Sequence, residues 1–147
     1  MTIGRRLETS DHVRALLGGV HRVAVLGIKT EKQASAPAFY VPEYLVKAGL
    51  DVVPVPVYFP EVTKILGREV YRTVAAVPPP RLDLVDVFRR PEDLMQHLPD
   101  LLVARPKAVW LQSGIRHKEF GDLLMAAGID VVEDRCLMVE HQSLLGP

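Results

Sequence analysis

The sequence of 147 residues contains a single cysteine, Cys136. One thiol excludes an internal disulfide and is typical of proteins in a reducing compartment. The first residues, MTIGRRLETSDHV, lack the apolar centre of a secretory signal, and no run approaches the roughly 20 apolar residues of a membrane span. Charge of either sign is not in excess, since 18 basic residues balance 18 acidic ones. We therefore expect a cytoplasmic protein that binds neither nucleic acid nor a membrane.

Two common nucleotide-binding motifs are also missing. The dinucleotide fingerprint needs three glycines, G-x-G-x-x-G, whereas only Gly27 follows the first apolar run. The acidic residue that holds a nicotinamide ribose belongs at the end of the second strand, but Asp51 lies at its beginning. The motif G-x-x-x-x-G-K-[S/T] does not occur. An NAD-binding protein is therefore disfavoured, and a nucleoside triphosphatase with a P-loop is disfavoured more strongly.

Apolar residues are plentiful, at 48%, which suffices for the core of one domain spanning 1–147. Short apolar runs alternate with helical patterns, and this alternation favours a parallel sheet covered on both faces. We predict an α/β, Rossmann-like three-layer sandwich with a doubly wound five-stranded parallel sheet. Its predicted strand order is 3-2-1-4-5, which puts the first strand in the centre. The strands are predicted at 21–28, 50–57, 82–88, 108–112 and 129–132.

Helices are predicted between these strands from apolar spacing and from caps. Ser10 and Asp11 are candidate N-caps of the first helix. Pro42 requires the second helix either to begin close to it or to have an irregular first turn, because an internal proline removes a hydrogen bond. One or two helical turns are also expected at 61–66. The main helices are predicted at about 10–18, from 37 or 42 to 48, 91–97, 117–127 and 139–145.

The unit of strand, glycine turn and helix around Gly27 predicts a phosphate site, because such turns aim main-chain N–H groups and a helix N-terminus at an anion. The alternative is that Gly27 only ends a buried strand. At the end of the second strand, the segment 54–57 suits the flat face of an adenine better than a ribose diol. Arg89 and Arg90 stand at a helix N-terminus, which is unfavourable for cations. We expect a ligand or carboxylates nearby, although a solvated pair is the simpler alternative.

Other reactive or polar residues have structural explanations. Trp110 lies inside a strand and is expected in the core, whereas Gln112 at the end of that strand is a candidate site residue. Cys136 and His141 would suit a nucleophile and a base, but a thiol at the end of a sheet is usually a small buried hydrophobe. Neither His117 with Glu119 nor Glu140 with His141 makes a compact metal-ligand set. Residues 133–135 are expected to form an ion pair in a loop. We predict no catalytic residue and no metal.

Five segments carry a resemblance to a known family. VAVLG, VVPV, DVFRRP, VWLQSG and VVEDRCLMVEH occur in this order between about 13 and 141. They resemble the small stand-alone coenzyme A-binding proteins, which are similar to the N-terminal domain of the succinyl-CoA synthetase α subunit. The resemblance implies a Rossmann-like fold and coenzyme A, or an acyl-CoA, as the ligand.

The resemblance also implies a set of binding residues. The pyrophosphate turn would comprise Gly27, Ile28 and Lys29. The adenine would lie beside Pro54, Val55 and Pro56. The ligand would pass Val87, Phe88 and Arg89 after the third strand, and its pantetheine arm would pass Gln112, Ser113 and Gly114. Family members often have a basic residue where this sequence has Ala36, so either Lys29 or Lys32 supplies the charge or the affinity for phosphate is lower.

The favoured function is non-catalytic binding of coenzyme A, with no protein partner specified and with a monomer or homodimer left open. Residues 137–139 are apolar and would pack internally or against a second copy. An enzyme or a regulatory subunit that handles acyl-CoA thioesters is the alternative. Against the enzyme, the related synthetase subunit carries its phosphorylated histidine in a second domain, and this sequence ends before one could begin.

Overall fold

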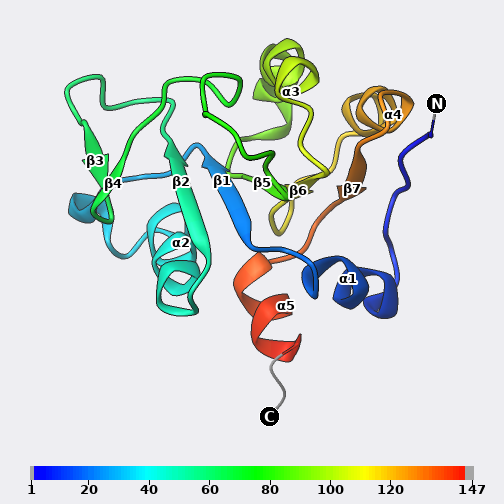
Figure 1. The fold of residues 1–147 in the computed structure, drawn as a ribbon, viewed down its shortest axis with the longest axis horizontal. Coiled ribbons are helices and arrows are strands. Elements are labelled where there is room, and N and C mark those ends of the chain that lie inside the picture. Colours follow the sequence, from blue (N-terminus) through cyan, green and yellow to red (C-terminus); the bar gives the residue numbers. More distant parts are fainter. Residues whose placement is uncertain (1, 145–147) are drawn as a thin grey trace.

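The computed structural model describes residues 2–144. They form three layers, with a parallel sheet between two layers of helices (Figure 1). All neighbouring strands in this sheet are parallel. The five strands are β1 (Arg22–Leu26), β2 (Asp51–Val55), β5 (Leu84–Val87), β6 (Ala108–Leu111) and β7 (Asp130–Val132). Each lies inside one of the predicted ranges, so the predicted fold class is confirmed.

The helices cover both faces of the sheet. One face packs against α1 (Ser10–Leu17), α2 (Pro37–Lys47) and α5 (Leu137–Leu144), and the other against α3 (Leu98–Ala104) and α4 (Lys118–Ala126) (Figure 1). The N-cap of α1 is Thr9, whose hydroxyl accepts a hydrogen bond from the His12 main chain; Ser10 and Asp11 already belong to the helix. Residues 91–97 form two 3-10 turns that lead into α3. The predicted end of the last helix, 145, lies outside the described residues.

The predicted strand order is wrong. The observed order is β2-β1-β5-β6-β7, so the third predicted strand, β5, pairs with β1 and occupies the centre. β2 lies at the edge of the sheet, where Pro54 is tolerated. An inner strand would need the N–H group that proline lacks to bond a neighbouring strand on that side. The carbonyl of Pro54 faces outward and accepts a hydrogen bond from the Tyr71 main chain rather than from a strand of the sheet.

The predicted helical turns at 61–66 are also wrong. This segment leads into a small antiparallel hairpin of β3 (Lys64–Ile65) and β4 (Arg68–Glu69). Leu66 and Gly67 form its turn with φ values of 54° and 72°. Two successive positive φ angles match the twist of a tight hairpin, and glycine accepts them without strain. The turn at Leu66 and Gly67 therefore favours a hairpin over the predicted helical turns.

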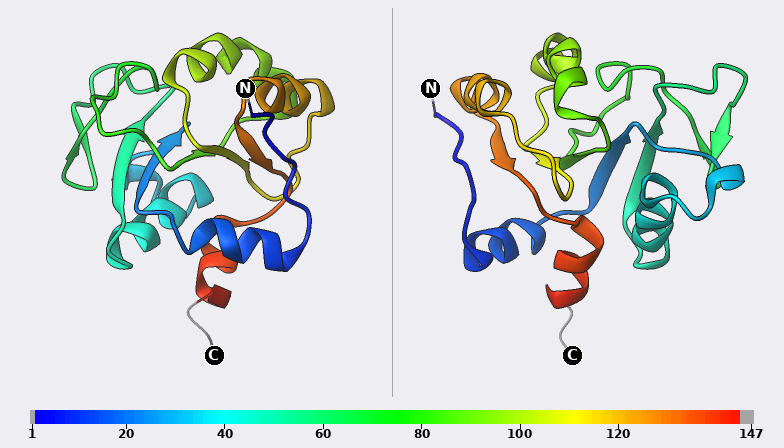
Figure 2. Two further views of the ribbon diagram at one scale, coloured as in Figure 1. Left: turned by 45° about the vertical axis from the view of Figure 1, so that its right-hand side comes forward. Right: turned by 180° about the vertical axis from the view of Figure 1, so that it is seen from behind.

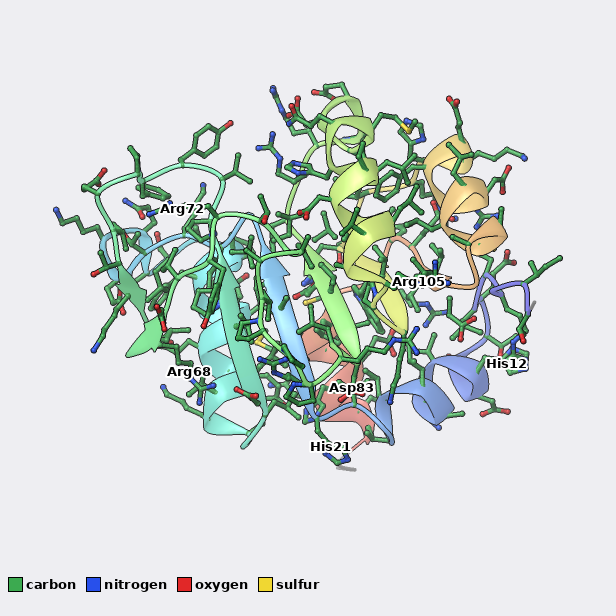
Figure 3. All side chains as sticks on the ribbon, turned by 45° about the horizontal axis from the view of Figure 1, so that its top comes forward. His12, His21, Arg68, Arg72, Asp83 and Arg105 are labelled. Carbon is green, nitrogen blue, oxygen red and sulfur yellow. The ribbon has the colours of Figure 1, made fainter. Side chains whose placement is uncertain are left out.

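The N-terminal segment runs beside β7 (Figure 2), where Arg6 forms an isolated parallel bridge with Val131. At the amino ends of the strands, Asp83 accepts hydrogen bonds from the main chains of His21 and Arg22, at 2.9 Å each (Figure 3). Lys107 pairs with the same carboxylate at 3.0 Å. This end of the sheet is thus fastened by charge-assisted contacts, and it lies opposite the end where the candidate site is found.

Candidate functional site

The carboxyl ends of β1 and β5 form the point where the winding of the sheet changes direction. From β1 the chain crosses outward to β2, and the later strands are added on the other side, beginning with β5. Loops that leave adjacent strands in opposite directions open a crevice, which is where ligands bind in such sheets. The predicted phosphate turn follows β1, so the site expected from the sequence lies at this crevice.

Gly27 is confined by the neighbouring strand end. Its φ is 88°, which favours glycine, and its main chain donates a hydrogen bond to the Val55 carbonyl at 2.9 Å. A Cβ atom at Gly27 would collide with the carbonyl oxygen of Phe88. The absence of a side chain therefore lets the loops after β1 and β5 approach each other.

Pro42 lies inside α2 and leaves one acceptor free. The helix begins at Pro37 and continues through Pro42, with an Ala36 N-cap that contributes no side-chain hydrogen bond. The carbonyl of Ala38, four residues before Pro42, accepts a hydrogen bond from the Lys29 main chain at 3.1 Å. The helix therefore tolerates its internal proline, and the vacated acceptor fastens the loop after β1 to the first turn of α2.

A cleft of about 600 Å³ lies at this edge. Six of the predicted site residues line it: Gly27, Lys29, Phe88, Arg89, Gln112 and Ser113. They come from the loops after β1, β5 and β6, which are far apart in the sequence. The alternating α/β topology brings them together, as expected for the carboxyl ends of parallel strands.

The other predicted site residues do not line this cleft. Ile28, Val55 and Val87 are buried in the core at 1% exposure or less. Pro54 and Pro56 are buried as well, Lys32 lies exposed on a 3-10 turn, and Gly114 lies exposed beyond Ser113. Because these residues do not line the cleft, the residues that do line it are the candidates for direct contact with a ligand.

Several residues that line the cleft were absent from the predicted set of binding residues. The first turns of α2 contribute Ala36, Pro37, Ala38, Tyr40 and Val41, and other loops contribute Tyr58, Arg90, Ile115 and Cys136. Tyr40 and Tyr58 are exposed aromatic residues at 37% and 61%. An exposed tyrosine next to a strand end was the available signal, since large aromatic rings at the surface often mark binding sites.

Arg89 is held in place by three neighbours. Its Nε donates to His97 Nε2 at 3.1 Å, and its guanidinium lies 5.7 Å from the centre of the Tyr58 ring. Burial lowers the pKa of His97, and the nearby Arg89 charge lowers it further, so the imidazole is kept neutral and able to accept. Asp93 Oδ2 lies 3.8 Å from Arg89 Nη2 and 3.0 Å from Arg90 Nε. The expected carboxylate pairing at this helix start is confirmed.

Gln112 connects the cleft to the interior. It is 7% exposed, and its amide nitrogen donates to Asp86 Oδ2 at 3.2 Å. Its amide oxygen accepts from the Leu137 main chain at 3.0 Å, at the start of α5. Burial raises the pKa of the Asp86 carboxyl well above its ordinary value, and the hydrogen bond from Gln112 opposes this only in part. The buried Asp86 carboxyl thus orients Gln112, a residue that lines the cleft.

The remaining candidates have mainly structural contacts. Trp110 is fully buried, as predicted, and His117 caps α4 by accepting from the Phe120 main chain. His141 bonds to the Tyr44 hydroxyl at 2.8 Å, and no hydrogen bond joins it to Cys136. Within 2–144, His, Cys, Asp and Glu side chains nowhere gather in threes around a possible metal position. In the same range no helix has both the length and the apolar character required to cross a bilayer.

Residues 133–135 form ion pairs with residues outside this segment instead of with each other. Glu133 pairs with Arg6 at 2.6 Å, and Asp134 with Arg116 at 3.3 Å. Arg135 pairs with Glu140 at 3.0 Å. The loop after β7 is therefore fastened to the N-terminal segment, to the loop after β6 and to α5.

Known proteins share this fold over most of the chain. The family model described as "CoA binding domain" matches residues 21–142. A solved structure, cell-free ID.343 from Thermus thermophilus, is 45% identical with a TM-score of 0.83, covering 93% of this chain and 99% of that one. A hypothetical protein from Pyrococcus horikoshii OT3 is 30% identical with a TM-score of 0.81, covering 99% and 100%. The uncharacterized protein YneT of Bacillus subtilis (strain 168) is 26% identical over 129 residues, 88% of this chain and 91% of that protein.

The family match runs from the start of β1 through most of α5 and so includes every loop that forms the cleft. The chain belongs to the CoA-binding domain family. The resemblance drawn from the five sequence segments is confirmed at this level.

Proposed function

We propose that the cleft binds coenzyme A or an acyl-CoA, and that the chain acts by recognition without catalysing a reaction. The observation that carries this proposal is the crevice between β1 and β5 in a chain of the CoA-binding domain family. There Gly27, Lys29 and the uncapped first turn of α2 line one cavity. A glycine turn, an ammonium group and a helix N-terminus are together suited to a pyrophosphate.

The ligand would extend from this phosphate end across the sheet. The pantetheine arm would pass Phe88 and then Gln112, Ser113 and Ile115, which line the same cleft farther along the strand order. The amide groups of pantetheine need hydrogen-bond partners, and Gln112 and Ser113 have suitable side chains. The thiol would then lie near Cys136.

For the adenine we propose Tyr58 as the contact, because Pro54, Val55 and Pro56 are buried. Tyr58 is the third residue after β2, is 61% exposed, and is oriented by the Arg89 guanidinium. A purine stacks on such a ring without needing a specific hydrogen bond. The proposed adenine contact therefore stays near the end of the second strand, but it moves from Pro56 to Tyr58, two residues farther along the chain.

An enzyme that handles thioesters is the second candidate, favoured by the position of Cys136 in the wall of the cleft. Covalent catalysis would require a base close to this thiol. His141 is instead bonded to Tyr44. Loss of thioester turnover in Cys136→Ala would support the enzyme, and equal rates with and without the wild-type protein would support pure binding.

Calorimetric titration with coenzyme A, acetyl-CoA, NAD and ATP tests the proposal. We expect coenzyme A and acetyl-CoA to bind and NAD to bind more weakly. If NAD bound while coenzyme A showed no heat at millimolar concentration, coenzyme A recognition would be rejected.

A further inference from the structure

A second cavity of about 600 Å³ adjoins the cleft. It lies beyond the loops that follow β6 and β7, and the N-terminal segment and the first turns of α5 complete its walls. Ser113 and Cys136 line both cavities. These two residues therefore form the boundary between the cleft and the second cavity.

We propose that the second cavity receives the acyl group of an acyl-CoA, and that this acyl group is short and uncharged. This inference rests on the proposed function, and it names the ligand class of that same site. Parallel strands lie about 4.8 Å apart, so the end of β7 is about 14 Å from the end of β1. That span is comparable to an extended pantetheine arm. A ligand with its pyrophosphate beside Gly27 thus brings its sulfur to Ser113 and Cys136.

The charges in the second cavity argue against an anionic acyl group. Its three arginines are each paired with an acid of the same cavity: Arg6 with Glu133, Arg116 with Asp134, and Arg135 with Glu140. The fourth acid, Glu8, has no basic side chain as an ion-pair partner among the described residues. A free carboxylate on the acyl group would therefore meet a surplus negative charge and no unpaired cation.

The walls also argue against a long fatty acyl group. The apolar side chains that reach the second cavity are those of Leu7, Cys136 and Val139, and charged residues make up most of the rest. A long alkyl chain would remain largely in contact with polar groups and gain little from burial. A short chain would need only the strip formed by Cys136 and Val139.

Val139 provides the sharpest test, because it lines the second cavity and not the cleft, and it is 55% exposed. We expect Val139→Trp to narrow the acyl subsite, weakening butyryl-CoA at least tenfold and leaving coenzyme A unchanged. Val103→Trp is the matched control, since Val103 is an exposed valine on α3, outside both cavities. Glu8→Trp narrows the cavity from the N-terminal segment and serves if Val139→Trp does not fold.

Calorimetry on the full chain would use coenzyme A, butyryl-CoA, succinyl-CoA and palmitoyl-CoA. We expect coenzyme A and butyryl-CoA to bind the wild type with similar affinity, and the other two to bind more weakly. Equal loss of coenzyme A and butyryl-CoA in Val139→Trp, or no loss of either, would overturn the acyl subsite. Tighter binding of succinyl-CoA or palmitoyl-CoA would overturn the ligand class. Failure of coenzyme A to bind the wild type would reject the proposed function itself, and the acyl subsite with it.

Discussion

The main-chain N–H of Lys29 donates to the carbonyl oxygen of Ala38, the acceptor that Pro42 leaves free within α2. This bond joins the loop after β1 to the helix whose N-terminus lines the cleft. An internal proline usually weakens a helix, but here it provides a partner for a loop that would otherwise lack one. The phosphate end of the proposed site therefore depends on Pro42, which does not line the cleft.

Pro42→Ala should weaken coenzyme A binding. An alanine at this position would supply an N–H that competes with Lys29 for the Ala38 carbonyl. Loss of one main-chain hydrogen bond costs about 0.5–1.5 kcal/mol, so affinity should fall about twofold to thirteenfold. Hydrogen exchange at the Lys29 amide should become faster, and calorimetry would measure the affinity. Pro99→Ala in the first turn of α3 is the control; equal behaviour of the two variants would show that the bond is unimportant.

Gly27→Ala should lower both stability and affinity. The change meets two obstacles, a φ of 88° and a collision with the Phe88 carbonyl. Gly67→Ala meets only the first, since its φ is 72° and no atom lies within 4 Å of the added Cβ. We expect a loss of about 1 kcal/mol for Gly67→Ala from backbone strain, and a larger one for Gly27→Ala. Urea unfolding would measure both.

Coenzyme A affinity separates the two glycine variants further. Gly27→Ala forces apart the loops after β1 and β5, so binding should fall by more than tenfold. Gly67→Ala changes a hairpin turn away from the cleft and should bind normally. Unchanged binding in Gly27→Ala would mean that the phosphate turn has been assigned to the wrong loop.

The sequence was sufficient to predict the elements of the sheet, but not their order. Apolar runs bounded by glycine and proline identified all five strands, because strand formation depends on local pattern. Strand order depends on which pairs bury best in three dimensions. Pro54 was nevertheless informative, since a proline within a strand favours an edge position.

The candidate site was predicted in part for a similar reason. Gly27, Arg89 and Gln112 follow strand ends, so the topology alone brings them to one edge. Tyr58 and Cys136 were not included, because which loop residues face the cleft depends on side-chain packing. The pairing of Arg6 with Glu133 spans nearly the whole sequence, and no local pattern indicates it.

Tyr58→Ala should selectively weaken ligands that contain adenine. Stacking of a base on an aromatic ring contributes about 1–3 kcal/mol, so coenzyme A affinity should fall about fivefold or more. Phosphopantetheine lacks the adenine and should bind Tyr58→Ala and the wild type equally. Tyr58→Phe keeps the ring and removes the hydroxyl that lies 3.3 Å from Arg89, and it should retain most of the affinity. An equal loss for both ligands in Tyr58→Ala would place the adenine elsewhere.

Asp86→Asn should be more stable than the wild type, and the difference in free energy of unfolding should grow as the pH rises. Because burial raises the pKa of Asp86, the folded state keeps this proton to a higher pH than the unfolded chain, whose reference value is 3.8. The wild type therefore loses stability from this group above that value, by up to about 1.4 kcal/mol per pH unit, until the pH reaches the folded-state pKa. Asparagine does not titrate and matches the protonated carboxyl in shape. Urea unfolding between about pH 4 and pH 7 would measure the growing difference.

Asp83→Asn is the matched control on the same segment and should show the opposite trend. Partial burial tends to raise the pKa of Asp83, but hydrogen bonds from the Arg22 and His21 main chains and the Lys107 charge outweigh it and lower the pKa. Its stabilising contribution is thus present above the unfolded-state pKa and is lost as the pH falls through the folded-state pKa. Asp83→Asn should cost stability near neutral pH and cost less in acid. Parallel pH profiles for wild type and Asp86→Asn would mean that Asp86 titrates normally, and that Gln112 is oriented by a charged carboxylate.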